Sequence, residues 1–399
     1  MRLEDMCTVF TDGDWIESKD QSDAGIRLIQ TGNIGEGTYL EKETRAKYIS
    51  EEVFEKLKCT EIYPGDILVS RLPEPVGRAC IIPEKDERMI TAVDCTICRL
   101  DQTIVSKEYL CYFMRSNAYY TRLLSSVTGT TRKRISRKNL GNIELNVPSK
   151  EEQKEVVRRL DCLVKIIDSR TKELELLEDL IKSRFVEMFG NPVTNEKRWK
   201  QKLLGEITTK IGSGATPKGG KSAYQENGIT LIRSMNVQNG MFEYKELAHI
   251  SDEQATKLDN VVIEENDVLL NITGASVARS CVVPSKILPA RVNQHVCIIR
   301  CKECIIPEFL NKLLIDDNYQ KLLWGIAGAG ATREAITKQQ VESLQIIMPP
   351  VELQNQFTDF VNQVDKSKLL EKIFGVKSGF ISLFPLRTRG LFPSKRLAN

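Results

Sequence analysis

The most regular hydrophobic pattern in the chain lies between residues 150 and 189, a stretch without proline or glycine. Apolar side chains recur there in steps of four and three, with Arg170 and Arg184 at the two remaining positions. The apolar positions are Val156, Leu160, Leu163, Ile167, Leu174, Leu177, Ile181 and Met188. This spacing predicts one helix of about 40 residues with a coiled-coil seam. At about 1.5 Å per residue it would span roughly 60 Å and act as a spacer.

A second helix of the same kind is predicted to begin at residue 351. Its first seam positions are Phe357, Val361 and Val364, which align with the start of the first seam. Beyond Val364 the pattern fails, because polar residues or glycine take the apolar positions and prolines follow. These residues are Lys368, Gly375, Ser378, Ser382, Pro385 and Pro393. We therefore expect a truncated helix over 351–374 and an aberrant tail over 375–399.

The rest of the chain contains an internal repeat with an offset of about 201 residues. Residues 77–83 (Gly-Arg-Ala-Cys-Ile-Ile-Pro) align with 278–284 (Ala-Arg-Ser-Cys-Val-Val-Pro). Each copy contains short β-rich runs that end in turns, such as 67–70 and 268–272. The sequence predicts two similar mixed α/β domains separated by long helices, an α+β architecture.

The expected boundaries follow from the repeat and from the helix signals. Ser149-Lys-Glu-Glu is close to a capping box, and Gly190-Asn-Pro ends the long helix. We expect a first domain over 1–149, a spacer helix over 150–190 and a second domain over 191–350.

Composition supports two ordinary globular domains. The length of 399 residues suits two domains of about 150 residues with connecting elements. Hydrophobic residues make up 41% and charged residues 28%, and no apolar run reaches the roughly 18 residues of a membrane span. A cytoplasmic location without membrane contact is expected. The eleven cysteines lie mostly in strand-like runs, which favours reduced, buried thiols.

Residues 215–222 resemble a phosphate-binding loop only in part. Ala215 replaces the first glycine, and the sequence after Ser222 does not build the helix that such a loop requires. A basic loop that presents Lys218 and Lys221 to a DNA backbone is the preferred interpretation.

No catalytic or metal site is predicted. The pairs Cys95-x-x-Cys98 and Cys301-x-x-Cys304 have the short spacing of zinc ligands, but they are not equivalent in the repeat. The histidines, His249 and His295, have neither a nucleophile motif nor metal-ligand spacing beside them. We expect buried thiols and no catalytic residue.

The clearest candidate for nucleic-acid binding lies between residues 115 and 138. The net charge is only +3, so a DNA surface must come from local clustering. The segment has no acidic residue and contains Arg115, Arg122, Arg132, Lys133, Arg134, Arg137 and Lys138. Such clusters neutralise phosphates, which supplies much of the affinity for DNA. The alternative is a solvated basic face.

The equivalent segment of the second copy keeps Arg333 but also carries acidic residues. There the contacts are expected from Lys218, Lys221, Arg233, Arg279 and Arg291. Base edges are read by Arg, Asn and Gln side chains. The loops 30–34 and 233–237 align and place Asn33 and Asn236 after an apolar strand, so they are candidates together with Arg71, Arg78 and Arg279. The alternative is that these loops are only turns at strand ends.

Four segments carry a resemblance to a known family. They are 204–207 (Leu-Gly-Glu-Ile), 211–217 (Ile-Gly-Ser-Gly-Ala-Thr-Pro), 228–237 and the proline-to-helix junction 349–357. Over residues 1–368 the chain resembles the specificity subunit of type I restriction-modification systems. The first copy departs from the pattern, because it lacks a clear Leu-Gly-Glu-Ile and Gly-Ser-Gly opening.

The resemblance implies two tandem target-recognition domains and two long helices that pair as an antiparallel coiled coil. Each domain would read one half of a bipartite double-stranded DNA site, and the helices would fix the gap and dock two modification subunits. S-adenosylmethionine, ATP and Mg²⁺ would belong to the modification subunits and to the restriction and motor subunits. The chain itself would neither methylate nor cut DNA. The alternatives are a coiled-coil scaffold that binds only protein and a stand-alone enzyme.

Overall fold

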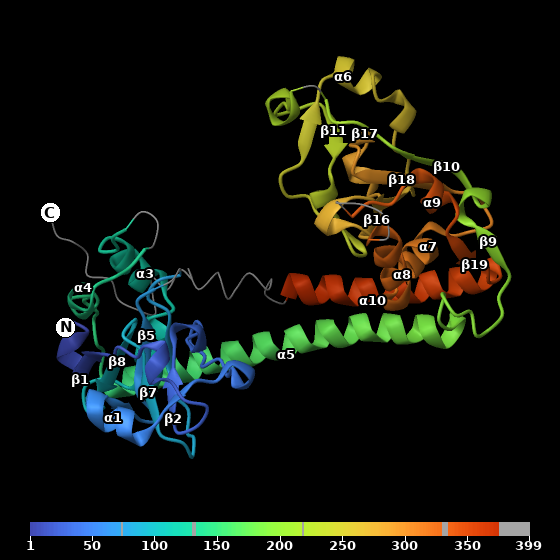
Figure 1. The fold of residues 1–399 in the computed structure, drawn as a ribbon. Coiled ribbons are helices and arrows are strands. Elements are labelled where there is room, and N and C mark those ends of the chain that lie inside the picture. The colour runs from blue at the N-terminus through green and yellow to red at the C-terminus, as the bar shows by residue number, and fades with distance from the viewer. Residues whose placement is uncertain (73–74, 130–132, 218, 329–333, 375–399) are drawn as a thin grey trace. The chain divides into compact units, whose positions relative to one another are not determined.

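The computed structural model describes residues 1–72, 75–129, 133–217, 219–328 and 334–374 (Figure 1). The described chain divides into two compact units, residues 1–171 and residues 172–374. The predicted tail over 375–399 lies outside the described residues. No helix in the described ranges is long and apolar enough to cross a membrane.

Strands in the described part of the first unit form two four-stranded sheets. The first sheet is antiparallel and has the order β1 (Cys7–Asp12), β8 (Cys95–Leu100), β5 (Ile67–Ser70) and β6 (Ala79–Ile81). The second has the order β3 (Tyr48–Ile49), β2 (Ile26–Ile29), β7 (Met89–Thr91) and β4 (Glu61–Ile62). The helices are α1 (Glu51–Leu57), α2 (Lys107–Phe113), α3 (Asn117–Leu124) and α4 (Arg137–Gly141).

The second unit repeats this plan. Its antiparallel four-stranded sheet has the order β10 (Thr208–Ser213), β18 (Val296–Cys301), β15 (Val268–Asn271) and β16 (Ser280–Val282). A three-stranded sheet contains β14 (Ala248–Ile250), β11 (Ile229–Ile232) and β17 (Ala290–Val292). Two pairs are β12 (Val237–Gln238) with β13 (Met241–Phe242), and β19 (Gln345–Ile347) with β9 (Gln201–Leu203). The helices are α6 (Asp252–Thr256), α7 (Pro307–Leu314), α8 (Asp317–Gly328), α9 (Lys338–Glu342) and α10 (Val351–Phe374).

The internal repeat is confirmed in detail. In both units the antiparallel four-stranded sheet pairs its first strand, β1 or β10, with its last, β8 or β18, with one register shift near the start of the first strand. In one unit Arg99 donates to the buried Asp66 at 2.8 Å, and in the other Arg300 donates to the buried Asp267 at 2.8 Å. The two units are therefore copies of one fold. Both contain an ion pair that links the antiparallel sheet to the loop before β5 or β15.

The opening of the first copy is closer to that of the second than the sequence suggested. Gly13 follows β1 as Gly214 follows β10. A side chain at Gly13 would collide with the carbonyl oxygen of Thr91, and one at Gly214 with that of Val292. The same close backbone approach thus requires glycine in both copies, although only the second has the Gly-Ser-Gly sequence.

The predicted long helix is α5 (Lys150–Phe189). Its capping box forms as predicted: Ser149 N donates to a carboxylate oxygen of Glu152 at 2.9 Å, and Glu152 N donates to the Ser149 hydroxyl at 3.3 Å. Near its start, Leu160 is fully buried in the core of the first unit, and Val156 packs against that core. Between residues 161 and 180 no side chain of the helix is buried.

Within the second unit, the end of α5 pairs with α10 in antiparallel orientation. The ring centroids of Phe185 and Phe189 lie 5.5 and 5.4 Å from that of Phe357. Later in α10 and earlier in α5, Lys368 Nζ donates to a carboxylate oxygen of Glu178 at 2.6 Å, as two helices of opposite direction require. Ile181, Val361 and Val364 belong to the same buried core, with Leu177 and Met188 packed against it.

The predicted seam included Phe357 but missed two other large residues of this helix pair. Phe185 and Phe189 are buried and, with Phe309 and Phe357, form an aromatic cluster that the steps of three and four did not single out. The second helix, α10, has the predicted bounds of 351–374 and continues past Val364, where the apolar pattern ends. Lys368 is buried, and its ammonium group binds Asp365 at 3.0 Å as well as Glu178. The charge is tolerated there because two carboxylates neutralise it.

Candidate nucleic-acid interface

Five basic side chains of the 115–138 segment are exposed on the first unit. They are Arg122, Lys133, Arg134, Arg137 and Lys138, which we call the basic loop surface. Backbone hydrogen bonds between Thr128 and Arg134, at 3.0 and 2.9 Å, close the loop that leads into α4. Ser136 caps that helix by accepting from Asn139 N at 3.1 Å. The residues therefore sit on short, locally fixed elements.

The ion pairs that Arg134 and Arg137 form on this surface are long. Arg134 Nη2 lies 3.7 Å from Asp94 Oδ1, and Arg137 Nη1 lies 4.0 Å from Asp12 Oδ2. Exposed pairs of this kind contribute about 0–1 kcal/mol. A phosphate can therefore replace the carboxylate as the partner at little cost.

Arg71 has a different role from its exposed neighbours. Its side chain is only 3% exposed, donates to Val93 O and binds Asp12 at 3.1 Å. Burial lowers the pKa of Arg71, and the nearby Asp12 carboxylate opposes that shift. The guanidinium thus holds the edge of the sheet together and does not extend from it.

Two further arginines named from the sequence also serve the fold of the first unit. Arg78 is half-buried and donates to Thr31 O at 3.4 Å. The guanidinium of Arg115 lies 5.4 Å from the centre of the Tyr112 ring. Arg132 lies outside the described residues.

The amides of Asn33 and Asn236 are buried and hold equivalent loops. Asn33 Oδ1 accepts from Gln30 N at 3.0 Å, and its Nδ2 donates to Leu40 O at 3.0 Å. Asn236 Oδ1 accepts from Arg233 N at 3.1 Å, and its Nδ2 donates to Glu243 O at 3.0 Å. Both amides have these partners inside the fold, so in this conformation they position the loop.

The named arginines of the second unit are likewise engaged. Arg279 donates to Gln238 at 2.8 Å, and Arg291, 8% exposed, binds Asp259 at 2.9 Å. Arg233 donates to Glu246 O and lies over the Tyr224 ring at 5.5 Å. Lys218 and Arg333 lie outside the described residues, as does the side chain of Lys221.

The second unit also has a polar cluster that the sequence analysis missed. Gln294 is exposed in the turn between β17 and β18, and its side chain contacts Thr216 and His295. The other ring nitrogen of His295 contacts the Thr273 hydroxyl. These residues come from three separate segments, so no local motif could have revealed them.

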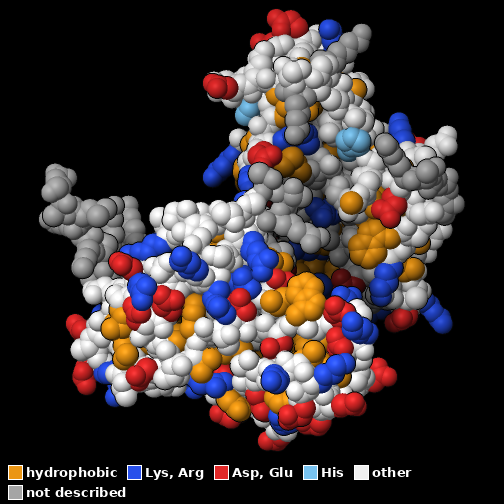
Figure 2. Space-filling model, turned by 60° about the vertical axis from the view of Figure 1, so that its left-hand side comes forward, with side chains coloured by type: hydrophobic (Ala, Val, Ile, Leu, Met, Phe, Trp, Pro, Cys, Tyr) orange, Lys and Arg blue, Asp and Glu red, His pale blue; other side chains and the backbone are white. Residues whose placement is uncertain are grey.

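The surface charge is mixed at larger scale. Figure 2 shows Lys and Arg side chains interspersed with Asp and Glu over the visible face. This agrees with the small net charge of +3. Any electrostatic attraction to DNA must therefore act through local groups such as the basic loop surface.

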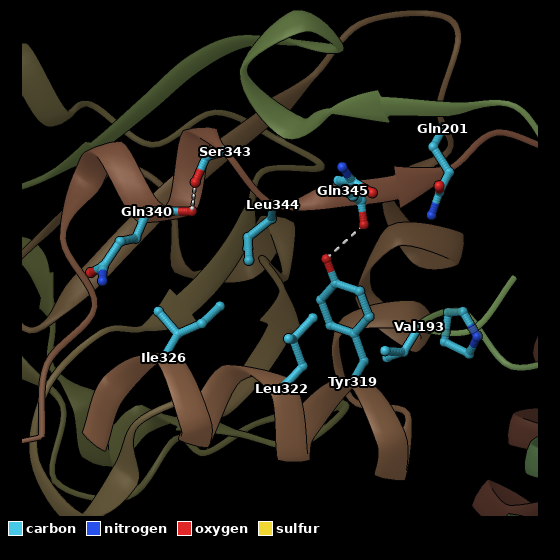
Figure 3. Close-up of a pocket in the computed structure, with 10 residues that line it drawn as sticks. Val193, Gln201, Tyr319, Leu322, Ile326, Gln340, Ser343, Leu344 and Gln345 are labelled. Atoms are coloured by element: carbon cyan, nitrogen blue, oxygen red, sulfur yellow. Dashed lines mark hydrogen bonds between the residues drawn. The ribbon is translucent and has the colours of Figure 1, made fainter. Parts of the chain in front are cut away.

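A cavity of about 480 Å³ in the second unit offers little chemistry. It lies between α8, α9, β19 and the segment that contains Val193 and Gln201 (Figure 3). Tyr319 donates to Gln345 O at 2.9 Å, and Ser343 donates to Gln340 O at 2.9 Å. Its lining residues are apolar or neutral polar, without a charged side chain.

Comparison with known proteins gives one consistent family. The family model "Type I restriction modification DNA specificity domain" matches residues 1–179 and 196–373. A putative type I restriction enzyme specificity subunit of Methanocaldococcus jannaschii is 22% identical over 364 residues, covering 85% of this chain and 82% of that protein.

Solved structures share the fold. A chain from a structure of type I R-M system assembly has a TM-score of 0.60 and 17% identity, covering 96% of this chain and 93% of that one. The type I restriction-modification S subunit from M. genitalium has a TM-score of 0.56 and 13% identity, covering 99% and 96%. With two matched domains that fill most of its length, the chain belongs to the type I restriction modification DNA specificity family.

Proposed function

We propose that the chain is the DNA sequence-recognition subunit of a type I restriction-modification complex. Each unit reads one half of a bipartite double-stranded target. The observation that carries this proposal is the pair of matched domains, which share one sheet order and are linked by a helix of 40 residues. Two similar readers on one spacer suit two half-sites whose separation is a geometric property of the protein.

The basic loop surface of the first unit supplies phosphate contacts. Its side chains are exposed, and the ion pairs of Arg134 and Arg137 with Asp94 and Asp12 are weak enough to exchange for phosphate oxygens. Arg132 belongs to the same segment and stays a predicted contact. We assign Arg71, Asn33 and Asn236 to the positioning of this surface and its neighbouring loops, because their polar atoms bind inside the fold.

In the second unit, phosphate contacts are proposed for Lys218, Lys221 and Arg333. Arg233, Arg279 and Arg291 each have an internal partner, so their contribution is to shape the surface. In this proposal the units share the equivalent positions Arg132 and Arg333, and the second unit adds Lys218 and Lys221.

The long helices set the gap and dock the modification subunits. The support is the stretch 161–180 of α5, which carries large apolar side chains that are exposed to solvent. Leu163, Ile166, Leu176 and Leu180 are between 44% and 58% exposed. Large apolar groups repeated along one exposed helix are typical of a protein interface. The interface proposed here is with two modification subunits, and restriction and motor subunits join that core.

The cofactors belong to the partners in this proposal. S-adenosylmethionine would be bound by the modification subunits, and ATP and Mg²⁺ by the restriction and motor subunits. This chain supplies sequence recognition and no chemical step. The complex acts on cellular DNA, so its location is the cytoplasm.

Methylome sequencing tests the function directly. The chain is expressed with its modification and restriction subunits in a host that lacks other adenine methylation. A split methylated motif that disappears when this chain is deleted is the expected result. A scaffold that binds only protein would support assembly without determining the motif. Methylation that is unchanged on deletion, or absent from a complex that assembles fully, would overturn the proposal.

A further inference from the structure

The turn between β17 and β18 holds a fixed arrangement of polar side chains. Asn293 is buried, its Oδ1 accepts from His295 N at 3.0 Å, and its backbone nitrogen donates to Ile232 O at 3.1 Å. Its carbonyl oxygen accepts from Gly214 N at 3.1 Å. The backbone that carries Gln294 is therefore held on both sides, while the Gln294 side chain remains exposed.

We propose that Gln294 contacts a base edge in the half-site read by the second unit, and that His295, Thr273 and Thr216 are positioning residues for its amide. The inference rests on the proposed function and names one residue that gives the second unit its sequence preference. It concerns a residue that the analysis of basic segments did not identify.

In the repeat, Gln294 lies at the edge of the second unit that is equivalent to the edge of the first unit that Arg134 of the basic loop surface approaches. In the first unit Asp12 lies opposite Thr96, and in the second Ser213 lies opposite Cys297. The turn before β8, which contains Asp94, is thus equivalent to the turn before β18. Arg134 approaches that edge in the first unit at 3.7 Å from Asp94. If the basic loop surface meets DNA, the equivalent edge of the second unit does so as well.

Hydrogen bonding fixes the orientation of the Gln294 amide. Its Oε1 accepts from the Thr216 hydroxyl, and its Nε2 lies 3.1 Å from His295 Nε2. When the amide donates to Nε2, the neutral ring carries its proton on Nδ1, facing the Thr273 hydroxyl oxygen. Both ring nitrogens then have partners, and the amide keeps one N–H and one oxygen lone pair for a ligand.

A free N–H beside a free carbonyl oxygen matches adenine. The major-groove edge of adenine presents the N7 acceptor beside the N6 donor, and a Gln amide can bind both. Because the amide is already held in place, it loses little conformational freedom when it binds a base. This favours discrimination between bases over nonspecific attraction to DNA. The first unit has the Asp94 and Arg134 charges at this edge. The two units therefore present different chemistry at equivalent positions, as readers of different half-sites should.

The test compares the wild-type complex with complexes that carry Gln294→Ala, Gln294→Glu or His295→Ala. Gln225→Ala is the matched control, because Gln225 is another exposed glutamine of the same unit. Binding is measured on duplexes in which each base pair of the mapped half-sites is replaced in turn, and methylomes are sequenced in parallel. Melting temperatures and co-purification with the modification subunit show that each variant folds and assembles.

Gln294→Ala is expected to relax one position of one half-site about tenfold, the low end for a bidentate pair, and to leave the other half-site and the gap unchanged. His295→Ala should relax the same position to a smaller extent, since Gln294 remains but is less fixed. Gln294→Glu should favour cytosine there, because a carboxylate accepts from the cytosine amino group. Gln225→Ala should behave as wild type.

Two results would overturn the inference alone. One is an unchanged base preference in both Gln294 variants, with a normal split motif from the wild type; the proposed function would then stand without this residue. The other is a uniform loss of binding on every duplex, which would give Gln294 a phosphate or structural role. A wild-type complex without any split motif would overturn the proposed function and the inference together.

Discussion

At the scale of single residues, the same side-chain type serves opposite purposes within a short distance. Arg71 is buried and bound to Asp12 at 3.1 Å, whereas Arg137 is exposed and 4.0 Å from the same carboxylate. The buried ion pair holds the sheet edge, and the exposed arginine is available to solvent and ligands. The sequence predicted both as DNA contacts, Arg137 from the basic segment and Arg71 together with the candidate base-reading loops, because an arginine in a sequence carries no sign of its exposure.

Removing Arg134 and Arg137 together tests the phosphate contacts. The double alanine variant should weaken binding to target and non-target duplexes alike and reduce the slope of log K against log[salt] by about 1.8, since each lost phosphate contact contributes about 0.9. The control removes Arg45 and Lys56, two exposed cations elsewhere on the first unit. Fluorescence anisotropy over a range of salt concentrations gives both slopes. Equal slopes for the two double variants would exclude this surface as the phosphate contact.

Lys312 gives a prediction for stability against pH. Burial lowers the pKa of Lys312, although Asp365 and Glu178 oppose the shift and Lys368 adds to it. The unfolded chain therefore binds more protons than the folded one between the lowered pKa and the ordinary lysine value of about 10.4. In that window the free energy of unfolding should rise with pH.

Lys312→Met removes this burial penalty. At pH 7 the variant should be as stable as wild type or more stable, by about 1 kcal/mol or less, and the difference should shrink toward pH 10. Urea denaturation at several pH values measures it. A Lys312→Met variant that is clearly less stable at pH 7 would show that the charge contributes favourably through its carboxylate neighbours.

At the scale of elements, one helix belongs to two environments. The start of α5 packs Leu160 into the first core, and its end packs Phe185 and Phe189 into the second. Between them, residues 161–180 have no buried side chain. The helix begins at the capping box of Ser149, and its middle stretch combines helix-forming residues with exposed apolar positions. A spacer with docking surfaces requires this combination.

Phe357→Ala tests the helix pair in the second unit. Removing a buried phenylalanine from the cluster with Phe185, Phe189 and Phe309 should lower the free energy of unfolding by about 3–5 kcal/mol. Leu180→Ala is the control, because Leu180 is largely exposed and should change stability by about 0.5 kcal/mol or less. Chemical denaturation of both variants gives the comparison. Similar losses would mean that the aromatic cluster does not hold the pair.

At the scale of the whole molecule, duplication explains why two readers differ in chemistry while sharing a frame. The sheet order, the register shift and the Arg–Asp pair recur in both units. The polar edge does not, since Val93 and Asp94 in one copy are equivalent to Gln294 and His295 in the other. Conserved frame and variable edge together are what a bipartite reader needs.

Lengthening α5 tests its role as the spacer. Seven helix-forming residues inserted after Ser169 add about 10.5 Å, close to three base pairs of duplex. The methylated motif should keep both half-sites and gain about three base pairs in the gap. The same seven residues appended after Asn399 should leave the motif unchanged. An insertion variant that methylates the original motif would show that the gap is set elsewhere.

The sequence by itself determined the elements that depend on local or repeated patterns. The 40-residue helix, its capping box, the duplication and the α+β class followed from periodicity, turn residues and the offset of about 201 positions. Family membership was foreshadowed by the same local motifs and is established by the family model over both copies.

Only the tertiary structure decided which polar residues face solvent and which hold the fold. Arg71 and Arg291 looked available, yet each has its partner in a segment distant along the chain, and the Asn33 amide binds backbone atoms of its own loop. Gln294 came to attention only after strand order brought it beside Thr216 and His295. The burial and the hydrogen-bond partners of a side chain depend on contacts between segments that come together only when the sheets assemble. A local sequence pattern does not specify those contacts.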